Sequence, residues 1–298
     1  MCGIVGLFLK DRSLEPRLGA LTNQMLITMC DRGPDSAGFA VYGKARSGTA
    51  KITMQSAAPD IDFAGLDAAV GKAIGSPVTI YVTSNHAVLT IPEKRVDEAR
   101  AEIRASRPNV RIMSTGSTIE IYKDVGYPTE VSERFGLAKM SGTHAIGHTR
   151  MATESAVTTL GSHPFSTGPD QCLVHNGSLS NHNNLRRGLR HDGMTFETEN
   201  DSEVAAAYLS WRIKQGMNLG EALTKSLDDL DGFFTFVVGT KDGFGVLRDP
   251  IACKPAVMAE TDQYVAFGSE YRALVNLPAI EKARVWEPEP STVYFWER

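Results

Sequence analysis

The sequence predicts an α+β fold in which stacked β-sheets are covered by helices. Strand-length apolar runs dominate the second half of the chain, with helical stretches between them. Mostly hydrophobic strands with helices between them favour layers of sheet and helix around shared cores. The runs are Ala145–His148, Cys172–His175, Phe233–Gly239, Gly243–Arg248, Val257–Ala259 and Val265–Gly268, and the helical stretches are Asn181–Arg190 and Asp201–Lys214.

The first residues of the chain predict a buried strand. Residues 1–8 are apolar and glycine-studded, which is unusual because chain ends normally fray. The apolar spacing from Leu14 to Met29 predicts a helix that ends at a turn signal, Asp31–Pro34. Gly38–Tyr42 then predicts another short strand.

A segment at about 44–142 predicts an inserted α/β unit. Asp62–Ile74 and Glu93–Ser106 have the spacing of amphipathic helices, whereas Val78–Thr83, Ala87–Ile91 and Thr118–Tyr122 have that of strands. The segment contains no catalytic motif, internal repeat or low-complexity tract. Its function cannot be derived from its residues.

The composition is that of an ordinary globular protein and argues against two classes of partner. Of the 298 residues, 42% are hydrophobic and 22% charged, and the formal net charge is −4. We therefore expect no nucleic-acid partner and no anionic membrane surface. No apolar stretch approaches the roughly 20 residues that span a bilayer, and the N-terminus lacks the pattern of a secretory signal.

The cysteines and histidines show no metal-binding pattern. Cys2, Cys30, Cys172 and Cys253 are widely scattered, without a CxxC pair. Reduced thiols in a cytoplasmic protein are the expectation. Because ligand spacing, a P-loop and a dinucleotide fingerprint are all lacking, we expect neither a metal nor a cofactor.

Cys2 is the first candidate for a catalytic residue. Removal of Met1 makes it the N-terminal residue, which then carries both a thiol and a free α-amine. The amine can act as the general base that a nucleophile otherwise takes from a histidine. The position also suits a small buried residue at a chain start, so the assignment depends on the rest of the sequence.

A series of short blocks, in order along nearly the whole chain, resembles class II glutamine amidotransferases. These enzymes use an N-terminal nucleophile, and only the middle segment interrupts the resemblance. It implies a four-layer αββα N-terminal-nucleophile hydrolase sandwich over residues 2–298, with the α/β insertion at about 44–142. The blocks are Cys2–Gly6, Arg32–Gly38, His148–Thr153, His175–Gly177, Asn200–Glu203, Asp231–Phe233, Arg248–Pro250 and Gly268–Glu270.

The resemblance implies a role for each matching residue in binding and cleaving glutamine. Cys2 is the nucleophile, and Asn176 with the Gly177 N–H stabilises the oxyanion. Arg150 is expected to bind the glutamine carboxylate through two hydrogen bonds, and Asp201 to bind the α-ammonium. Thr153 is expected to line the pocket. Arg32 and Asp35 support the start of the chain.

Plainer interpretations of the same residues remain open. Asn176-Gly177 also fits a tight turn, Asp201 a helix N-cap, and Arg32–Asp35 a surface turn. With an α-amine available as base, we expect His148 and His175 to be structural.

The resemblance also implies a partner chain, because family members that use the ammonia themselves carry an acceptor domain. Here no such domain follows before Arg298. The arrangement looks like the amidotransferase subunit of split glutamate synthases or N-methylglutamate synthase complexes. In those complexes, separate chains resemble flavin-binding and β-helical modules. The insertion then has two open roles: a docking or channel-capping element, or a decorative insertion, which costs little in a surface loop.

Two other functions remain open besides a glutaminase subunit that supplies a synthase. One is a free-standing amidohydrolase that acts on glutamine or a γ-glutamyl amide. The other is a non-catalytic scaffold subunit that kept the fold.

Overall fold

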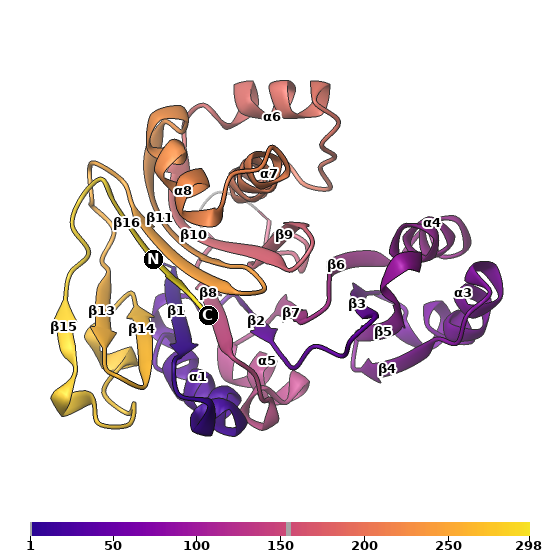
Figure 1. The fold of residues 1–298 in the computed structure, drawn as a ribbon, viewed down its shortest axis with the longest axis horizontal. Helices are drawn as coiled ribbons and strands as arrows, with labels where there is room; N and C mark the ends of the chain where they lie inside the picture. The colour runs from indigo at the N-terminus through magenta and orange to yellow at the C-terminus, as the bar shows by residue number, and fades with distance from the viewer. Residues whose placement is uncertain (1, 153–155) are drawn as a thin grey trace.

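The computed structural model describes residues 2–152 and 156–298, in which two antiparallel sheets lie between helical layers (Figure 1). This confirms the predicted α+β class. No helix in the described ranges is long and apolar enough to cross a membrane.

The larger sheet has seven strands in the order β15-β13-β14-β1-β8-β2-β7. Strand β1 lies inside this sheet between β14 and β8, which explains why a chain end is fully buried. The strands are β1 (Gly3–Leu9), β2 (Ser36–Tyr42), β7 (Ile119–Val125), β8 (His144–Arg150), β13 (Val257–Glu260), β14 (Tyr264–Gly268) and β15 (Arg284–Trp286).

The second sheet has five strands in the order β16-β12-β11-β10-β9 and packs face to face on the first. Ile4 and Phe8 of β1 face its strands, where they pack with Val174 and Phe244 in the core between the sheets. The strands are β9 (Phe165–Gly168), β10 (Gln171–Leu179), β11 (Gly232–Gly239), β12 (Gly243–Arg248) and β16 (Thr292–Glu297).

Helices cover the outer faces of both sheets, which gives four layers (Figure 1). Helices α1 (Leu18–Ile27) and α5 (Pro128–Phe135) cover the face of the larger sheet that carries Val5 and Leu7 of β1, and they share one core with these residues. Helices α7 (Asp201–Lys214) and α8 (Leu219–Asp229) pack on the smaller sheet, and α6 (His182–His191) packs on α7. Short 3₁₀ turns are η1 (Arg12–Arg17), η2 (Cys30–Arg32), η4 (Leu137–Lys139), η5 (Tyr271–Ala273) and η6 (Ile280–Lys282).

A separate unit with its own core projects from one end of the sandwich (Figure 1). Its sheet has the order β4-β5-β3-β6, and Ile52, Leu66, Leu89 and Ile103 are buried between this sheet and its helices. Its elements are β3 (Thr49–Gln55), α2 (Pro59–Asp62), α3 (Leu66–Ile74), β4 (Thr79–Thr83), β5 (His86–Pro92), η3 (Glu93–Arg95), α4 (Val96–Ser106) and β6 (Arg111–Gly116).

This inserted unit, β3 to β6, is shorter than the segment at about 44–142 that the sequence predicted. Strand β7 and helix α5 lie within that segment but belong to the larger sheet and its helical layer. The reason is the burial of β7, whose Ile119 and Ile121 enter the core between the two sheets.

Candidate active site

Cys2 directly precedes β1 and lies between the end of β8 in the larger sheet and Asn176 of β10 in the second sheet. Its backbone carbonyl oxygen accepts hydrogen bonds from Arg32 Nε at 3.0 Å and from Asn176 Nδ2 at 3.3 Å. Its Sγ lies 3.9 Å from the carbonyl oxygen of Met151, just beyond the end of β8. Because β1 and β8 are antiparallel, the first residues of β1 sit beside Arg150 at the last position of β8.

Asn176 and Gly177 lie inside strand β10 rather than in a tight turn. They pair with Thr235 and Phe234 of β11. Gly177 has φ +150°, and a Cβ there would lie 1.9 Å from the Phe233 carbonyl oxygen, so the close approach of β11 requires glycine. The Asn176 amide carries two N–H donors and uses one on Cys2, which leaves one for a bound group.

Residues 32–35 form a turn packed against the end of β8. Arg32 Nη1 pairs with Glu270 at 2.6 Å, and hydrogen bonding from Arg32 lowers the pKa of Glu270. A Cβ on Gly33 would lie 2.4 Å from the backbone carbon of Thr149. Asp35 accepts a hydrogen bond from the backbone N–H of Ala152 at 2.7 Å. The turn therefore contacts both Cys2 and the segment that follows Arg150.

Arg150 is buried at the last position of β8. Its Nη1 donates to the carbonyl oxygen of Ala156 at 3.4 Å. Thr153, the other residue expected to line the glutamine pocket on this segment, lies outside the described residues, as does Met1.

Asp201 is the first residue of α7, but the helix N-cap is Asn200, whose side chain accepts from the Ser202 N–H. The Asp201 carboxylate instead accepts from the backbone N–H of Leu179 at 2.9 Å, two residues beyond Gly177. An ionised carboxylate has about four lone-pair sites, so Asp201 keeps capacity for a cation.

A cluster of buried histidines lies behind Asp201 and Asn176. Ser202 Oγ lies 2.8 Å from His163 Nε2, 2.9 Å from His175 Nδ1 and 3.3 Å from an Asp201 oxygen. Because a carboxylate only accepts, Ser202 donates to Asp201, and both imidazoles must donate to Ser202. His148 stacks on His163 and donates through Nε2 to the carbonyl oxygen of His175.

The electrostatics of this cluster favour neutral imidazoles. Burial lowers the pKa of His148 to about 3. Burial also lowers the pKa of His163 and that of His175, although for His175 the Asp201 carboxylate acts in the opposite direction. The hydrogen bonds of His148 and His175 run to this network rather than to Cys2, which fits a structural role. His163 and Ser202 were not predicted from the sequence as site residues, although Ser202 lies within the Asn200–Glu203 block.

Among the described residues no group of three or more His, Cys, Asp or Glu side chains is arranged to hold a metal ion. The four cysteines are free thiols. The site thus offers one thiol, two potential oxyanion donors, a guanidinium and a carboxylate around one strand end.

Comparison with known proteins decides the family. The glutamine amidotransferase domain family matches residues 148–276. Glutamine amidotransferase-like protein GlxB of Rhizobium meliloti is 68% identical over 297 residues, with 100% of this chain and 98% of that protein covered. A putative glutamine amidotransferase of Methanothermobacter thermautotrophicus is 34% identical, with both chains covered completely. The chain belongs to the glutamine amidotransferase family.

The solved structures show which glutamine amidotransferase fold this is. Glutamine phosphoribosylpyrophosphate amidotransferase from B. subtilis superposes with a TM-score of 0.63 at 19% identity. The match covers 99% of this chain and 47% of that one. Its fold, the class II N-terminal-nucleophile sandwich, is the fold of this chain. A glutamine amidotransferase domain implies glutamine as its substrate.

Proposed function

We propose that the chain hydrolyses glutamine to glutamate and ammonia with Cys2 as nucleophile. The observation that carries the proposal is the position of the Cys2 carbonyl, held by both Arg32 and Asn176 at one strand end. These two contacts fix the main chain of Cys2 beside the proposed oxyanion donors. Fixing a nucleophile in this way is how a site lowers the entropic part of a barrier.

The proposed reaction proceeds in two steps through a thioester. The α-amine of Cys2 takes the thiol proton, and Sγ attacks the side-chain amide carbon of glutamine. The second N–H of Asn176 and the backbone N–H of Gly177 stabilise the tetrahedral oxyanion. The protonated amine then donates to the leaving nitrogen, so that ammonia departs, and water attacks the thioester to release glutamate and the thiol.

Recognition of glutamine is proposed to use opposite charges at the two ends of its backbone. Arg150 binds the α-carboxylate, and Asp201 binds the α-ammonium. Thr153, which lies outside the described residues, is proposed to line the same pocket. The Leu179 N–H and the Ser202 hydroxyl already hold the Asp201 carboxylate, so its orientation is set before substrate arrives.

Labelling with a glutamine-like electrophile tests the nucleophile. We expect the intact mass to show loss of Met1 and one adduct of 6-diazo-5-oxonorleucine, and peptide mapping to place that adduct on Cys2. Cys2→Ser is expected to take no label, while Cys253→Ser, which removes an exposed thiol, keeps it. A mature chain that takes no label, or a label that persists in Cys2→Ser, would rule out the mechanism and favour a scaffold role.

We further propose that the ammonia passes to a synthase partner of the glutamate synthase or N-methylglutamate synthase type, in the cytoplasm. Such a partner would supply flavin-binding and β-helical modules on separate chains. Support comes from exposed apolar side chains beside the site. Met151 follows Arg150, Phe233 lies against Gly177, and Tyr271 follows Glu270, the ion-pair partner of Arg32.

Glutaminase rates separate this proposal from a free-standing amidohydrolase. We expect the isolated chain to hydrolyse glutamine slowly and to speed up when synthase chains from the same source are added. Phe233→Glu and Tyr271→Glu should abolish that stimulation, whereas Tyr81→Glu, a change at a more exposed aromatic residue on the inserted unit, should not. A fully active isolated chain that no synthase chain stimulates would favour the free-standing enzyme.

A further inference from the structure

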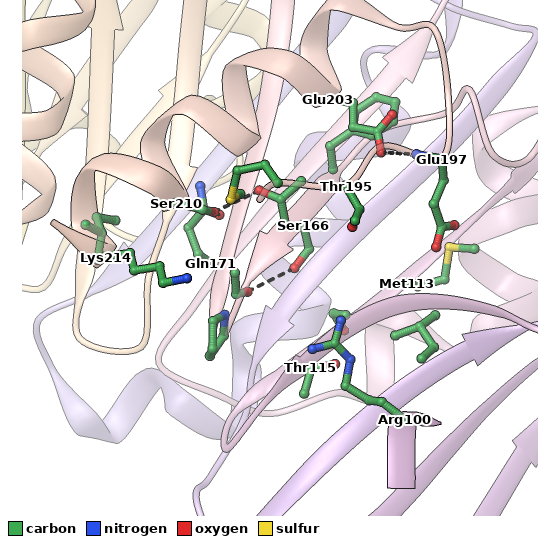
Figure 2. A pocket seen from close by; sticks show the side chains of 18 of the residues that line it. Arg100, Met113, Thr115, Ser166, Gln171, Thr195, Glu197, Glu203, Ser210 and Lys214 are labelled. Carbon is green, nitrogen blue, oxygen red and sulfur yellow. Dashed lines mark hydrogen bonds between the residues drawn. The ribbon is translucent and has the colours of Figure 1, made fainter. Parts of the chain in front are cut away.

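A cavity of about 800 Å³ lies between the inserted unit and the body of the molecule. One wall comes from α4 and β6, and the other from β9, α7 and residues 193–198 (Figure 2). Cys2, Arg150, Asn176 and Asp201 are not among the described residues that line it. The volume falls within the range of about 300–1,000 Å³ typical of small-molecule sites.

The two walls are held in a fixed relation although they belong to different cores. The carboxylate of Asp170, next to the cavity, accepts hydrogen bonds from Ser117, Thr118 and Ile119, at the junction of the inserted unit with β7. A Cβ on Gly116 would lie 2.2 Å from Asp170 Oδ1, so the two segments touch without a gap. The cavity is therefore preformed.

The charged groups at its inner end are already satisfied by the backbone. Lys123 Nζ donates to the carbonyl oxygens of Leu160, Ser162 and Pro164, which uses all three of its hydrogens. The Glu203 carboxylate accepts from the backbone N–H groups of residues 197 and 198. Lys123 therefore has no hydrogen left for a ligand, and residues 197 and 198 already make three hydrogen bonds to the Glu203 carboxylate.

Cations nearer the opening lack strong partners. Arg100 and Arg104 lie one turn apart on α4, and Lys214 projects from α7 on the facing wall (Figure 2). Among the described residues, Arg100 has one ion pair, a long contact of 3.9 Å to the exposed Asp97, and its buried Nε has no hydrogen-bond partner. Within the described chain no carboxylate lies within 4.0 Å of Arg104 or Lys214. The lining also contains carboxylates, so its overall charge is mixed and the attraction for an anion is local to these three cations.

The rest of the lining suits hydroxyl groups. Thr115 and Thr195 face the space, and neither side chain makes a hydrogen bond with the described residues (Figure 2). Glu197, on the same segment as Thr195, also lines the space, and a carboxylate there accepts hydroxyl hydrogens from a ligand. A bare inorganic anion would leave these groups without partners.

We propose that this cavity binds a small polyhydroxylated organic anion, with its charged group between Arg100 and Lys214 and its hydroxyls on Thr115, Thr195 and Glu197. The charged group is a phosphate ester or a carboxylate, because a guanidinium and an ammonium bind both. The site is separate from the glutamine chemistry, and its occupancy does not depend on an active Cys2.

Calorimetric titration of the full chain with size-matched probes tests the proposal. Glucose 6-phosphate represents the phosphate ester, gluconate the carboxylate, and sorbitol is the uncharged control. We expect saturable binding of at least one anion at millimolar concentration or below, and none of sorbitol. Whether glucose 6-phosphate or gluconate binds then identifies the charged group of the ligand as a phosphate ester or a carboxylate. The titration is repeated with Cys2→Ser, so that loss of glutaminase activity and loss of this site are read separately.

Variants of the two facing cations locate the binding. Arg100→Gln and Lys214→Gln are each expected to raise the Kd for the anion by about tenfold, because each removes a charge-assisted hydrogen bond. Arg187→Gln is the matched control, since Arg187 is exposed on α6 and does not line the cavity. Absence of binding by both anions, or binding unchanged in Arg100→Gln and Lys214→Gln, would overturn the proposal.

Discussion

Arg32 Nε donates a hydrogen bond of 3.0 Å to the carbonyl oxygen of Cys2. The same guanidinium pairs with Glu270, so one side chain fastens the residue just before β1 to the segment beyond β14. The planar guanidinium of arginine carries several N–H donors in a fixed arrangement and can make both contacts at once. The ammonium of lysine is a compact point charge that lacks this fixed arrangement. The position of Cys2 therefore depends on an arginine that need not touch glutamine.

Arg32→Lys is expected to lower kcat for glutamine hydrolysis by about 10- to 100-fold, because a misplacement near 1 Å has that effect on a reacting group. Steady-state kinetics on glutamine would show the drop with KM little changed. Arg272→Lys, which also contacts Glu270 but not Cys2, is the control and should retain kcat. Equal kcat for Arg32→Lys and wild type would contradict a positioning role.

Asn176→Ala is expected to lower kcat by about 100- to 1,000-fold, the usual effect of removing one oxyanion donor. KM for glutamine should change little, because the donor acts on charge that develops during the reaction. The measurement is glutaminase kinetics together with labelling by 6-diazo-5-oxonorleucine. A large rise in KM at constant kcat would instead assign Asn176 to substrate binding.

Ser202→Ala removes the hydroxyl that donates to Asp201 and accepts from two imidazoles. We expect KM for glutamine to rise about tenfold, since a hydrogen bond to a charged group contributes about 1.5–3 kcal/mol. The melting temperature should also fall, because two buried N–H groups lose their acceptor. Ser202→Thr restores a hydroxyl and should recover KM. Ser210→Ala, further along the same helix, is the control and should leave KM unaltered. A Ser202→Ala enzyme with normal KM would contradict a role of Ser202 in orienting Asp201 for glutamine binding.

Acid should destabilise the fold through buried histidines. Burial lowers the pKa of His86, of His144 and of His148 to about 3, against 6.5 when unfolded. Between pH 6.5 and 3 the unfolded chain binds more protons than the folded chain, so stability is full above pH 6.5 and is lost as pH falls. Each histidine contributes a slope of up to about 1.4 kcal/mol per pH unit.

Urea unfolding at pH 7, 6 and 5 measures this slope. His191→Asn is the control, because His191 is exposed and its removal should leave the profile unchanged. A free energy of unfolding that stays constant from pH 7 to pH 5 would contradict the prediction.

Asp170→Asn should loosen the junction of the inserted unit. The amide replaces one acceptor oxygen by a donor that faces the N–H and O–H groups of Ser117 and Thr118. We expect the free energy of unfolding to fall by about 3 kcal/mol and the amide hydrogens of residues 117–119 to exchange faster. Asp262→Asn, an exposed change in the turn before β14, should alter neither quantity. Unchanged exchange at 117–119 would mean that the carboxylate does not hold the junction.

Strands and site residues were predictable from the sequence where local pattern and structure agree. Continuous apolar runs located β1, β8 and β11. The sequence could not decide whether Asn176-Gly177 is a turn or part of a strand, because the answer depends on how closely β11 approaches Gly177.

Other elements were missed for identifiable reasons. Strands β3 and β6 are rich in Thr, Ser, Lys and Arg, which weakens the apolar signal. Helix α8 begins at a capping box of Asn218 and Glu221, a signal present in the sequence but not used. His163 and Ser202 meet only through tertiary contacts, since residues 39 positions apart share one hydrogen bond.

Tyr42 at the end of β2 stands opposite Ile119 at the start of β7, so the inserted unit occupies the place of a hairpin turn. The entropy cost of closing a loop rises by only about 0.6 kcal/mol for each doubling of its length. Exchange of this connection during evolution therefore leaves the strand order intact and the catalytic end of the sandwich undisturbed. The unit behaves as a replaceable module, free to acquire a ligand or a partner under selection separate from that on the glutamine site.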